Sequence, residues 1–299
     1  MFNQLIARTL PIVPKPIVRR VSQRYIAGET INDAVQAVQR LQQRGAVATI
    51  DVLGEFVRSR EQAQQEAGMS LHVLDAIHQH DLRSGVSVKL TSLGLDIDDA
   101  LCYTNVRNIV ARAAEIGRFV RLDMENSPYT TKTLDIYRRL RSEGFANTGV
   151  VIQAYMRRSE DDIRLLASDR ASVRLCKGIY IEPEEIAFRK REEIQEHYKR
   201  LLCMLFDNGM YVAIATHDDV LLDFAQEEII RRGLRREQYE FQMLLGVREH
   251  KRDELIRAGH KVRIYVPFGH DWYGYSIRRL QENPEVAGHI VKAMFGIGR

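Results

Sequence analysis

The chain is organised around a stretch near its end, Tyr265-Val-Pro-Phe-Gly-His-Asp-Trp-Tyr-Gly-Tyr-Ser-Ile-Arg-Arg-Leu-Gln-Glu-Asn-Pro284. It begins as the tail of an apolar run, breaks at a proline and a glycine, and restarts as a helical pattern. Tyr275 lies beside Arg278 and Arg279, because helix residues three and four apart share a face, and Glu282 follows one turn later. Two guanidiniums, a ring and a carboxylate can hold a small carboxylate ligand. By itself, however, this stretch favours an ordinary solvated surface helix.

The composition is typical of a globular protein and gives little support to nucleic-acid binding. The 299 residues are 45% hydrophobic and 28% charged, and the net charge of +4 is too small to indicate a nucleic-acid partner. The pI of about 8.9 is compatible with peripheral contact with an anionic membrane surface.

The cysteines and the apolar runs predict a cytoplasmic protein. Cys102, Cys176 and Cys203 are far apart, odd in number and without a C-x-x-C pair, which disfavours a disulfide framework or a zinc site. No apolar run approaches the roughly 20 residues that span a bilayer. The N-terminus is interrupted by prolines and does not resemble a secretory signal.

Short apolar runs rich in β-forming residues recur at intervals close to the length of a strand plus a helix. They begin near Val47, Val86, Phe119, Val150, Val173, Tyr211, Glu240 and Val262. Between them, helical patterns cover residues 98–116, 131–141, 161–166, 183–206, 219–232 and 250–257, with Pro183 in the first turn of its helix. An earlier helix opens at Thr30 and closes at Gly45.

This alternation predicts an α/β protein, a (β/α)8 TIM-type barrel with N-terminal helices. An open doubly wound sheet is the main rival, but no G-x-G-x-x-G follows an early strand, so a Rossmann nucleotide site is not supported. We expect residues 1–29 to form a helical or irregular arm, basic near Arg19 and Arg24. Residues 30–299 then form the barrel as a single domain.

Polar side chains follow six successive strands at their carboxyl ends, where barrel enzymes carry their reacting groups. They include Lys89, the pair Asp123 and Glu125, Gln153, Arg174 with Lys177 and Gly178, Thr216 with His217, and Gln242. One such residue means little, but six converging groups favour an active site.

Each of these residues also has an ordinary structural interpretation. Lys89 can extend to solvent, Asp123 can cap a turn and Glu125 can be a surface carboxylate. A guanidinium in the middle of a barrel strand, as at Arg174, needs an anionic or dipolar partner inside. His217 is more often a hydrogen-bonded structural residue, and no second ligand stands at metal spacing around it, so we predict no metal site.

The predicted rim combines amides, cations and a glycine with the arginine pair and a carboxylate. The first set suits a polar heterocycle with its pyrophosphate, and the second suits a zwitterionic amino acid. A cofactor beside an amino acid indicates oxidation of that amino acid by hydride transfer.

The ordered motifs of the chain resemble those of the proline dehydrogenase family, from roughly Tyr25 onward. They are Val86-Ser-Val-Lys-Leu-Thr-Ser-Leu-Gly94, Arg121-Leu-Asp-Met-Glu-Asn126, Val151-Ile-Gln-Ala-Tyr155, Val173-Arg-Leu-Cys-Lys-Gly-Ile-Tyr180, Ala215-Thr-His-Asp218, Glu240-Phe-Gln-Met-Leu244 and Tyr275-Ser-Ile-Arg-Arg-Leu-Gln-Glu282. The resemblance implies an FAD-dependent barrel that oxidises L-proline to Δ1-pyrroline-5-carboxylate by hydride transfer to flavin N5. It implies electron transfer to a quinone and a final helix that caps the barrel mouth. The end of the chain soon after the arginine pair resembles the monofunctional bacterial form, without an aldehyde dehydrogenase half.

Residue roles follow from the same resemblance. It implies Asp123 and Arg174 as catalytic residues, with Arg174 at the flavin N5 edge. The substrate would contact Lys89, Asp123, Tyr180, Leu244, Tyr265, Tyr275, Arg278 and Arg279. FAD would contact Met124, Gln153, Arg174, Lys177, Gly178, Ile179, Thr216, His217 and Gln242, and Glu282 would hold an arginine in place.

Two residues depart from the family pattern, and two other function classes remain open from the residues alone. Ile181 stands where bifunctional members usually have tryptophan, and Asp218 stands where many have asparagine. A lyase or aldolase would form a Schiff base through Lys89 or Lys177. A non-enzymatic basic scaffold would bind RNA or an anionic membrane through its N-terminal arm. For the enzyme, a transient contact with pyrroline-5-carboxylate dehydrogenase and peripheral contact at the inner membrane face are compatible partners.

Overall fold

The computed structural model describes residues 18–19 and 23–282, and for residues 278–282 it describes the backbone alone. Within this part, parallel strands close into a barrel in the order of the sequence, and β8 pairs with β1. The strands are β1 (Val47–Val52), β2 (Ser84–Val88), β3 (Val120–Leu122), β4 (Thr148–Gln153), β5 (Ser172–Cys176), β6 (Tyr211–Ala215), β7 (Tyr239–Leu244) and β8 (Val262–Phe268). Each begins within two residues of its predicted start, so the predicted barrel is confirmed.

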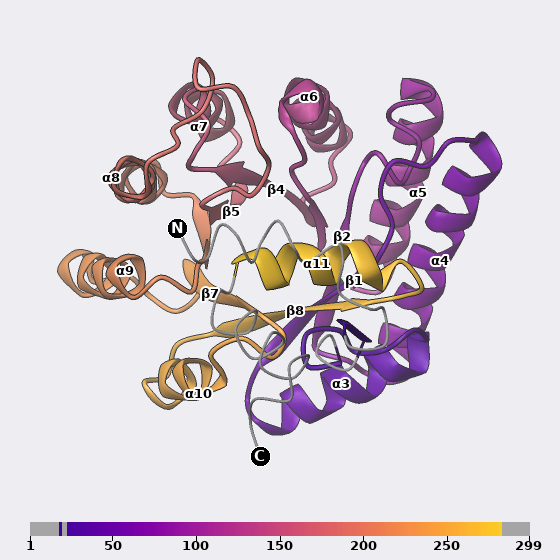
Figure 1. Ribbon diagram of the computed structural model, residues 1–299, viewed down its shortest axis with the longest axis horizontal. Helices are drawn as coiled ribbons and strands as arrows, with labels where there is room; N and C mark the ends of the chain where they lie inside the picture. Colours follow the sequence, from indigo (N-terminus) through magenta and orange to yellow (C-terminus); the bar gives the residue numbers. More distant parts are fainter. Residues whose placement is uncertain (1–17, 20–22, 283–299) are drawn as a thin grey trace, which may run out of the picture.

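Helices surround the strands, and one helix lies across them. In Figure 1, α3 to α10 form the outer ring and α11 crosses the middle of the view. The helices are α3 (Ile31–Gln43), α4 (Arg60–Gln79), α5 (Asp99–Glu115), α6 (Ser127–Ser142), α7 (Ser159–Ala167), α8 (Arg191–Asp207), α9 (Asp219–Arg232), α10 (Glu249–Arg257) and α11 (Trp272–Glu282).

The first and last of these helices exchange the usual roles. In a regular barrel the helix after β8 packs outside that strand, but here α3, which precedes β1, packs against both β1 and β8. Helix α11 is left to lie over the mouth, where Tyr275 lines the same cavity as Lys89. Tyr275 also packs with Ile26 and Leu53, which anchors α11 to the segment before α3 and to the end of β1. The predicted capping helix is therefore confirmed.

Helix α3 begins as its sequence predicts. Thr30 accepts a hydrogen bond from the backbone N–H of Asp33 at 3.2 Å, and the Asp33 carboxylate accepts one from the backbone N–H of Thr30 at 2.9 Å. This reciprocal capping box satisfies two donors that the first helical turn leaves without partners. The helix ends before Gly45, whose φ of +84° is accessible to glycine without strain.

Two helices differ from the prediction. Helix α4 was not predicted, because small residues such as Ala63 and Ala67 form much of its buried face and give a weak apolar stripe. The prediction that a helix begins at Pro183 is wrong, since α8 begins at Arg191. Residues 183–190 instead form a turn in which the Ile186 N–H donates to the Pro183 carbonyl at 3.2 Å.

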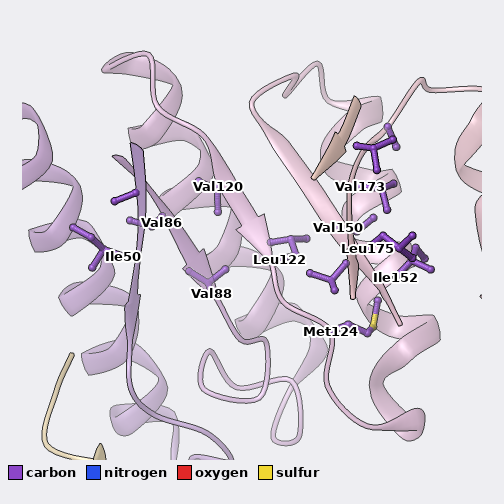
Figure 2. Packing of buried hydrophobic residues seen from close by; sticks show 14 of the residues in the cluster. Ile50, Val86, Val88, Val120, Leu122, Met124, Val150, Ile152, Val173 and Leu175 are labelled. Atoms are coloured by element: carbon purple, nitrogen blue, oxygen red, sulfur yellow. The ribbon is translucent and has the colours of Figure 1, made fainter. Parts of the chain in front are cut away.

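The strands alternate between an apolar outer face and a polar inner face. The outer side chains join those of the helices in one buried cluster, and Figure 2 shows those from Ile50 on β1 to Leu175 on β5. Burying each such side chain contributes about 1.5–3 kcal/mol. The inner side chains instead bond across the barrel, as when Tyr265 on β8 donates to Asp123, which follows β3. Outward burial thus supports the barrel while its mouth carries charge.

Candidate active site

A cavity of about 780 Å³ lies at the carboxyl ends of the strands. It brings together nearly all of the site residues predicted from the sequence: Lys89, Asp123, Met124, Gln153, Arg174, Lys177, Gly178, Ile179, Tyr180, Thr216, His217, Gln242, Leu244, Tyr265 and Tyr275. The side chains of Arg278, Arg279 and Glu282 lie outside the described residues, although their backbone belongs to α11.

Arg174 lines this cavity, and two neighbouring side chains hold its guanidinium. Its Nη1 donates to Asp123 Oδ1 at 2.6 Å, and its Nε donates to Gln242 Oε1 at 2.6 Å. The Gln242 amide nitrogen donates in turn to Glu240 Oε1 at 2.6 Å, which fixes the orientation of the amide. With only 8% of Arg174 exposed, these contacts supply the partners that a guanidinium inside a barrel requires.

Asp123 is ionised because cations surround it. Ser87 donates to its Oδ1, and the Tyr265 hydroxyl donates to its Oδ2 at 2.8 Å. Burial opposes the negative charge, but the cations Arg174 and Lys89 outweigh it and hold the pKa of Asp123 below its usual value. The cavity therefore presents a carboxylate, not a carboxylic acid, at neutral pH.

Lys89 does not extend to solvent, since its side chain is only 11% exposed. Its Nζ donates to Asp51 Oδ1 at 2.8 Å and lies 3.4 Å from the Tyr265 hydroxyl. Burial disfavours the ammonium, but Asp51 and Asp123 outweigh burial and raise the pKa of Lys89. A Schiff-base enzyme needs a neutral amine, so this environment argues against that role for Lys89.

Cations on the opposite wall of the cavity gather around Asp218. Its buried carboxylate accepts from Arg191 at 3.1 Å and from Gln195 at 3.0 Å, and it lies 3.4 Å from Lys177 Nζ. These two cations line the cavity, as does Arg248. The wall therefore suits a ligand with negative charge, such as a pyrophosphate.

The loop after β5 is fixed against the loop after β4. Gly178 has a φ of +101°, and a Cβ built there would lie 2.1 Å from the Tyr155 ring. The Tyr155 N–H donates to the Lys177 carbonyl at 2.8 Å. Glycine is therefore required at position 178, both for the backbone conformation and for the close approach of the ring.

Two further residues of the rim have structural contacts. His217 Nε2 accepts from the Leu244 N–H at 3.0 Å, in line with its structural interpretation. Glu125 is fully buried and accepts from the Thr91 N–H at 3.0 Å, so the alternative of a surface carboxylate is wrong. No group of three or more His, Cys, Asp or Glu side chains suited to a metal occurs among the described residues.

Several residues at the site were not predicted. Asp51 ends the polar inner face of β1, and the strand-end rule applied to this first apolar run would have found it. Tyr25, Glu55, Arg191 and Arg248 also line the cavity, but they lie in loops or at helix starts. No periodicity in the sequence marks those four positions.

Across the described part of the chain, none of the helices combines the length and the apolar character needed to cross a membrane.

Comparisons with known proteins agree with the fold and with the motifs. The family model for proline dehydrogenase matches residues 34–292. Proline dehydrogenase 1 of Bacillus subtilis (strain 168) is 38% identical over 273 residues, which cover 91% of this chain and 90% of the relative. Proline dehydrogenase of Deinococcus radiodurans is 34% identical over 307 residues, covering 98% and 99% of the two chains.

Solved structures show the same barrel within longer proteins. Proline utilization A of Bdellovibrio bacteriovorus, inactivated by N-propargylglycine, superposes with a TM-score of 0.83 at 25% identity. The match covers 89% of this chain but only 33% of the other, so this chain spans about a third of that protein.

Proposed function

This chain belongs to the proline dehydrogenase family of oxidoreductases, and on that premise we propose that it oxidises L-proline to Δ1-pyrroline-5-carboxylate with FAD as its cofactor. The observation that carries the proposal is a single cavity in which an ionised carboxylate, a buried arginine and a buried lysine meet. A zwitterionic amino acid offers the complementary charges to these groups.

The residues of the cavity fit FAD. Lys177, Arg191 and Arg248 outnumber Asp218 and Asp219, the two carboxylates that pair with them, so this wall keeps positive charge for a pyrophosphate. Amide and hydroxyl groups of Gln153, Gln242 and Thr216 can bond the edges of a polar ring system. When bound, FAD would supply the hydride acceptor at N5 for the oxidation of the amino acid.

The substrate would lie between Lys89 and a group of apolar and aromatic side chains on the cavity wall. Lys89 would bind the proline carboxylate, together with Arg278 and Arg279 as the family resemblance implies. Tyr180, Leu244, Tyr265 and Tyr275 would bound the pyrrolidine ring. Helix α11 would exclude water from the mouth while substrate is bound, because Tyr275 already lines the cavity from above.

Asp123 and Arg174 would form the catalytic pair. The ionised Asp123 can attract the positively charged amine of proline and accept a hydrogen bond from it. Arg174, held by Asp123 and Gln242, keeps a fixed positive charge at the cavity wall. Such a preorganised charge stabilises negative charge that develops on a neighbouring group without any rearrangement of the protein.

The quinone acceptor, a transient contact with pyrroline-5-carboxylate dehydrogenase and contact with the membrane surface also belong to this proposal. The first two are suggested by family membership, and the third by the basic pI of about 8.9. They are separable from the chemistry, because reduction of the flavin by proline requires none of them.

The visible spectrum of the purified protein tests the proposal directly. We expect flavin absorption bands that bleach when L-proline is added without oxygen and that return when a soluble quinone follows. D-proline, which presents the wrong face of the ring carbon, is the matched control. A colourless protein trapped on a ketose by borohydride would instead identify a Schiff-base lyase, and flavin bands unaffected by L-proline would contradict the substrate.

A further inference from the structure

Asp51 lies directly behind the lysine that the site presents to its ligand. It stands near the carboxyl end of β1, and it is only 1% exposed. Its Oδ1 accepts from Lys89 Nζ at 2.8 Å, whereas its Oδ2 is buried without a hydrogen-bond partner among the described residues. Lys89 lines the cavity and Asp51 does not, so the Lys89 ammonium stands between Asp51 and a ligand.

Two carboxylates, Asp51 and Asp123, attract the ammonium of Lys89. Its ammonium bonds to Asp51 but lies 3.4 Å from the Tyr265 hydroxyl, and that hydroxyl donates to Asp123 at 2.8 Å. Asp51 thus contacts the ammonium directly, whereas the connection of the ammonium to Asp123 runs through Tyr265. Without Asp51, Lys89 would keep the charges of Asp123 and Glu55 in its surroundings but would lose the contact that fixes its position at the cavity wall.

Asp51 also offsets the cost of burying the Lys89 ammonium at the cavity wall. Burial by itself lowers the pKa of Lys89, and Asp51 is the leading charge that opposes this effect, ahead of Asp123. Asp51 shares in the penalty, because its own burial raises its pKa to about 6. A buried carboxylate that keeps one oxygen without a partner has a cost that packing alone does not explain.

We propose that Asp51 is a positioning residue for the substrate carboxylate, acting by fixing the Lys89 ammonium at the cavity wall. The inference rests on the proposed function, since it assigns the carboxylate of an amino-acid substrate to Lys89. It concerns the carboxylate end of the ligand alone. Asp51 therefore affects how tightly carboxylates bind and leaves the recognition of the amine unchanged.

The test compares two halves of proline as ligands of the FAD-loaded protein. Cyclopentanecarboxylate carries the carboxylate without the amine, and pyrrolidine carries the amine without the carboxylate. Binding of each is followed by the change in the flavin spectrum or by calorimetry. One charge-assisted hydrogen bond contributes about 1.5–3 kcal/mol. We therefore expect Asp51→Asn to weaken the binding of cyclopentanecarboxylate about tenfold or more, and the binding of pyrrolidine by less than about twofold.

A matched variant separates this role from a loss of structure. Asp162 is also a buried carboxylate at 3% exposure, and it pairs with Arg158 at 2.9 Å away from the cavity. Asp162→Asn is expected to change thermal stability without selective loss of either ligand. Equal weakening of both ligands by Asp51→Asn, or unchanged or tighter binding of cyclopentanecarboxylate, would overturn the proposal.

A double-mutant cycle tests the route through Lys89. In a Lys89→Met background, Asp51→Asn should not weaken the binding of cyclopentanecarboxylate any further, because the ammonium that Asp51 positions is gone. The same loss in both backgrounds would show that Asp51 acts by another path and would refute the inference. Flavin bleaching by L-proline is scored separately on the unchanged protein, so failure of the proposed function and failure of the Asp51 role remain distinguishable.

Discussion

Removing the guanidinium of Arg174 should expose how the charges at the cavity depend on one another. The change Arg174→Met keeps most of the side-chain volume but deletes the contacts to Asp123 and Gln242, each at 2.6 Å. Breaking a buried ion pair from one side costs about 3–5 kcal/mol, because the other charge stays buried. Lys89 and the Tyr265 hydroxyl still face Asp123, so we expect a loss near the lower end, about 3 kcal/mol at neutral pH.

The pH dependence of this loss has a definite sign. In the unchanged protein the pKa of Asp123 is lowered, so its contribution to stability is present above the usual value of about 3.9 and is lost only as the pH falls through the lowered pKa. Without Arg174, the effect of burial dominates and the pKa of Asp123 rises. The folded state of the variant is then destabilised by the buried charge of Asp123, an effect that is absent at low pH and grows as the pH rises. The stability deficit should be widest near pH 7–8 and should narrow toward about pH 4.

Urea unfolding of both proteins at a fixed FAD concentration, across this pH range, measures the deficit. Arg112→Met is the control, because Arg112 pairs with Asp75 on the protein surface, where the loss of an ion pair changes stability little. Adding Asp123→Asn to Arg174→Met should recover much of the stability, since the unpaired charge is then removed. A deficit below about 1 kcal/mol, or one of equal size at about pH 5 and pH 8, would refute the account of Asp123 and Arg174.

Three further changes test other parts of the site. Arg279→Met should raise the Michaelis constant for L-proline roughly 10- to 150-fold through loss of one charge-assisted contact, and an unchanged constant would refute the carboxylate role that the family resemblance gives this arginine. Gly178→Ala places a Cβ 2.1 Å from the Tyr155 ring at a φ of +101°, so the purified protein should retain less FAD, and full occupancy would contradict the fixed-loop interpretation. Glu182→Ala removes acceptors for the Ser127 N–H at 2.6 Å and hydroxyl at 2.8 Å, where the loop after β5 caps α6. Calorimetric melting should show a destabilisation of about 0.5–2 kcal/mol, whereas an unchanged melting temperature would mean that water replaces the cap.

The order of elements was readable from the chain because it depends on local patterns. Strands that bury one face against helices need apolar residues such as Val86 and Val88, and their starts could be placed within two residues. The first turn of α3 was equally legible, since Thr30 and Asp33 make a cap with each other and with nothing distant. Helix α4 was not predicted because it lacks such a local pattern: the alanines on its buried face give no strong apolar periodicity.

The members of the active site could be named from the sequence, but their partners could not. Closure of eight strands brings every inward side chain at the carboxyl ends to one mouth, so strand-end residues such as Lys89 and Gln242 were predictable without knowing any distance. Which groups pair across that mouth depends on strand register and on the width of the barrel. Tyr265 reaches Asp123 over a separation of 142 residues, and no local pattern encodes such a contact.

The sequence by itself determined the barrel, the family motifs and the kinds of group at the rim, because periodicity and residue type are properties of neighbours in the chain. Only the tertiary structure decided that Asp51 stands behind Lys89, that Asp123 is ionised, and that Arg174 is held by both Asp123 and Gln242. The physical reason is that the charge state of a buried group depends on the few ångströms around it, and closure of the barrel sets those distances.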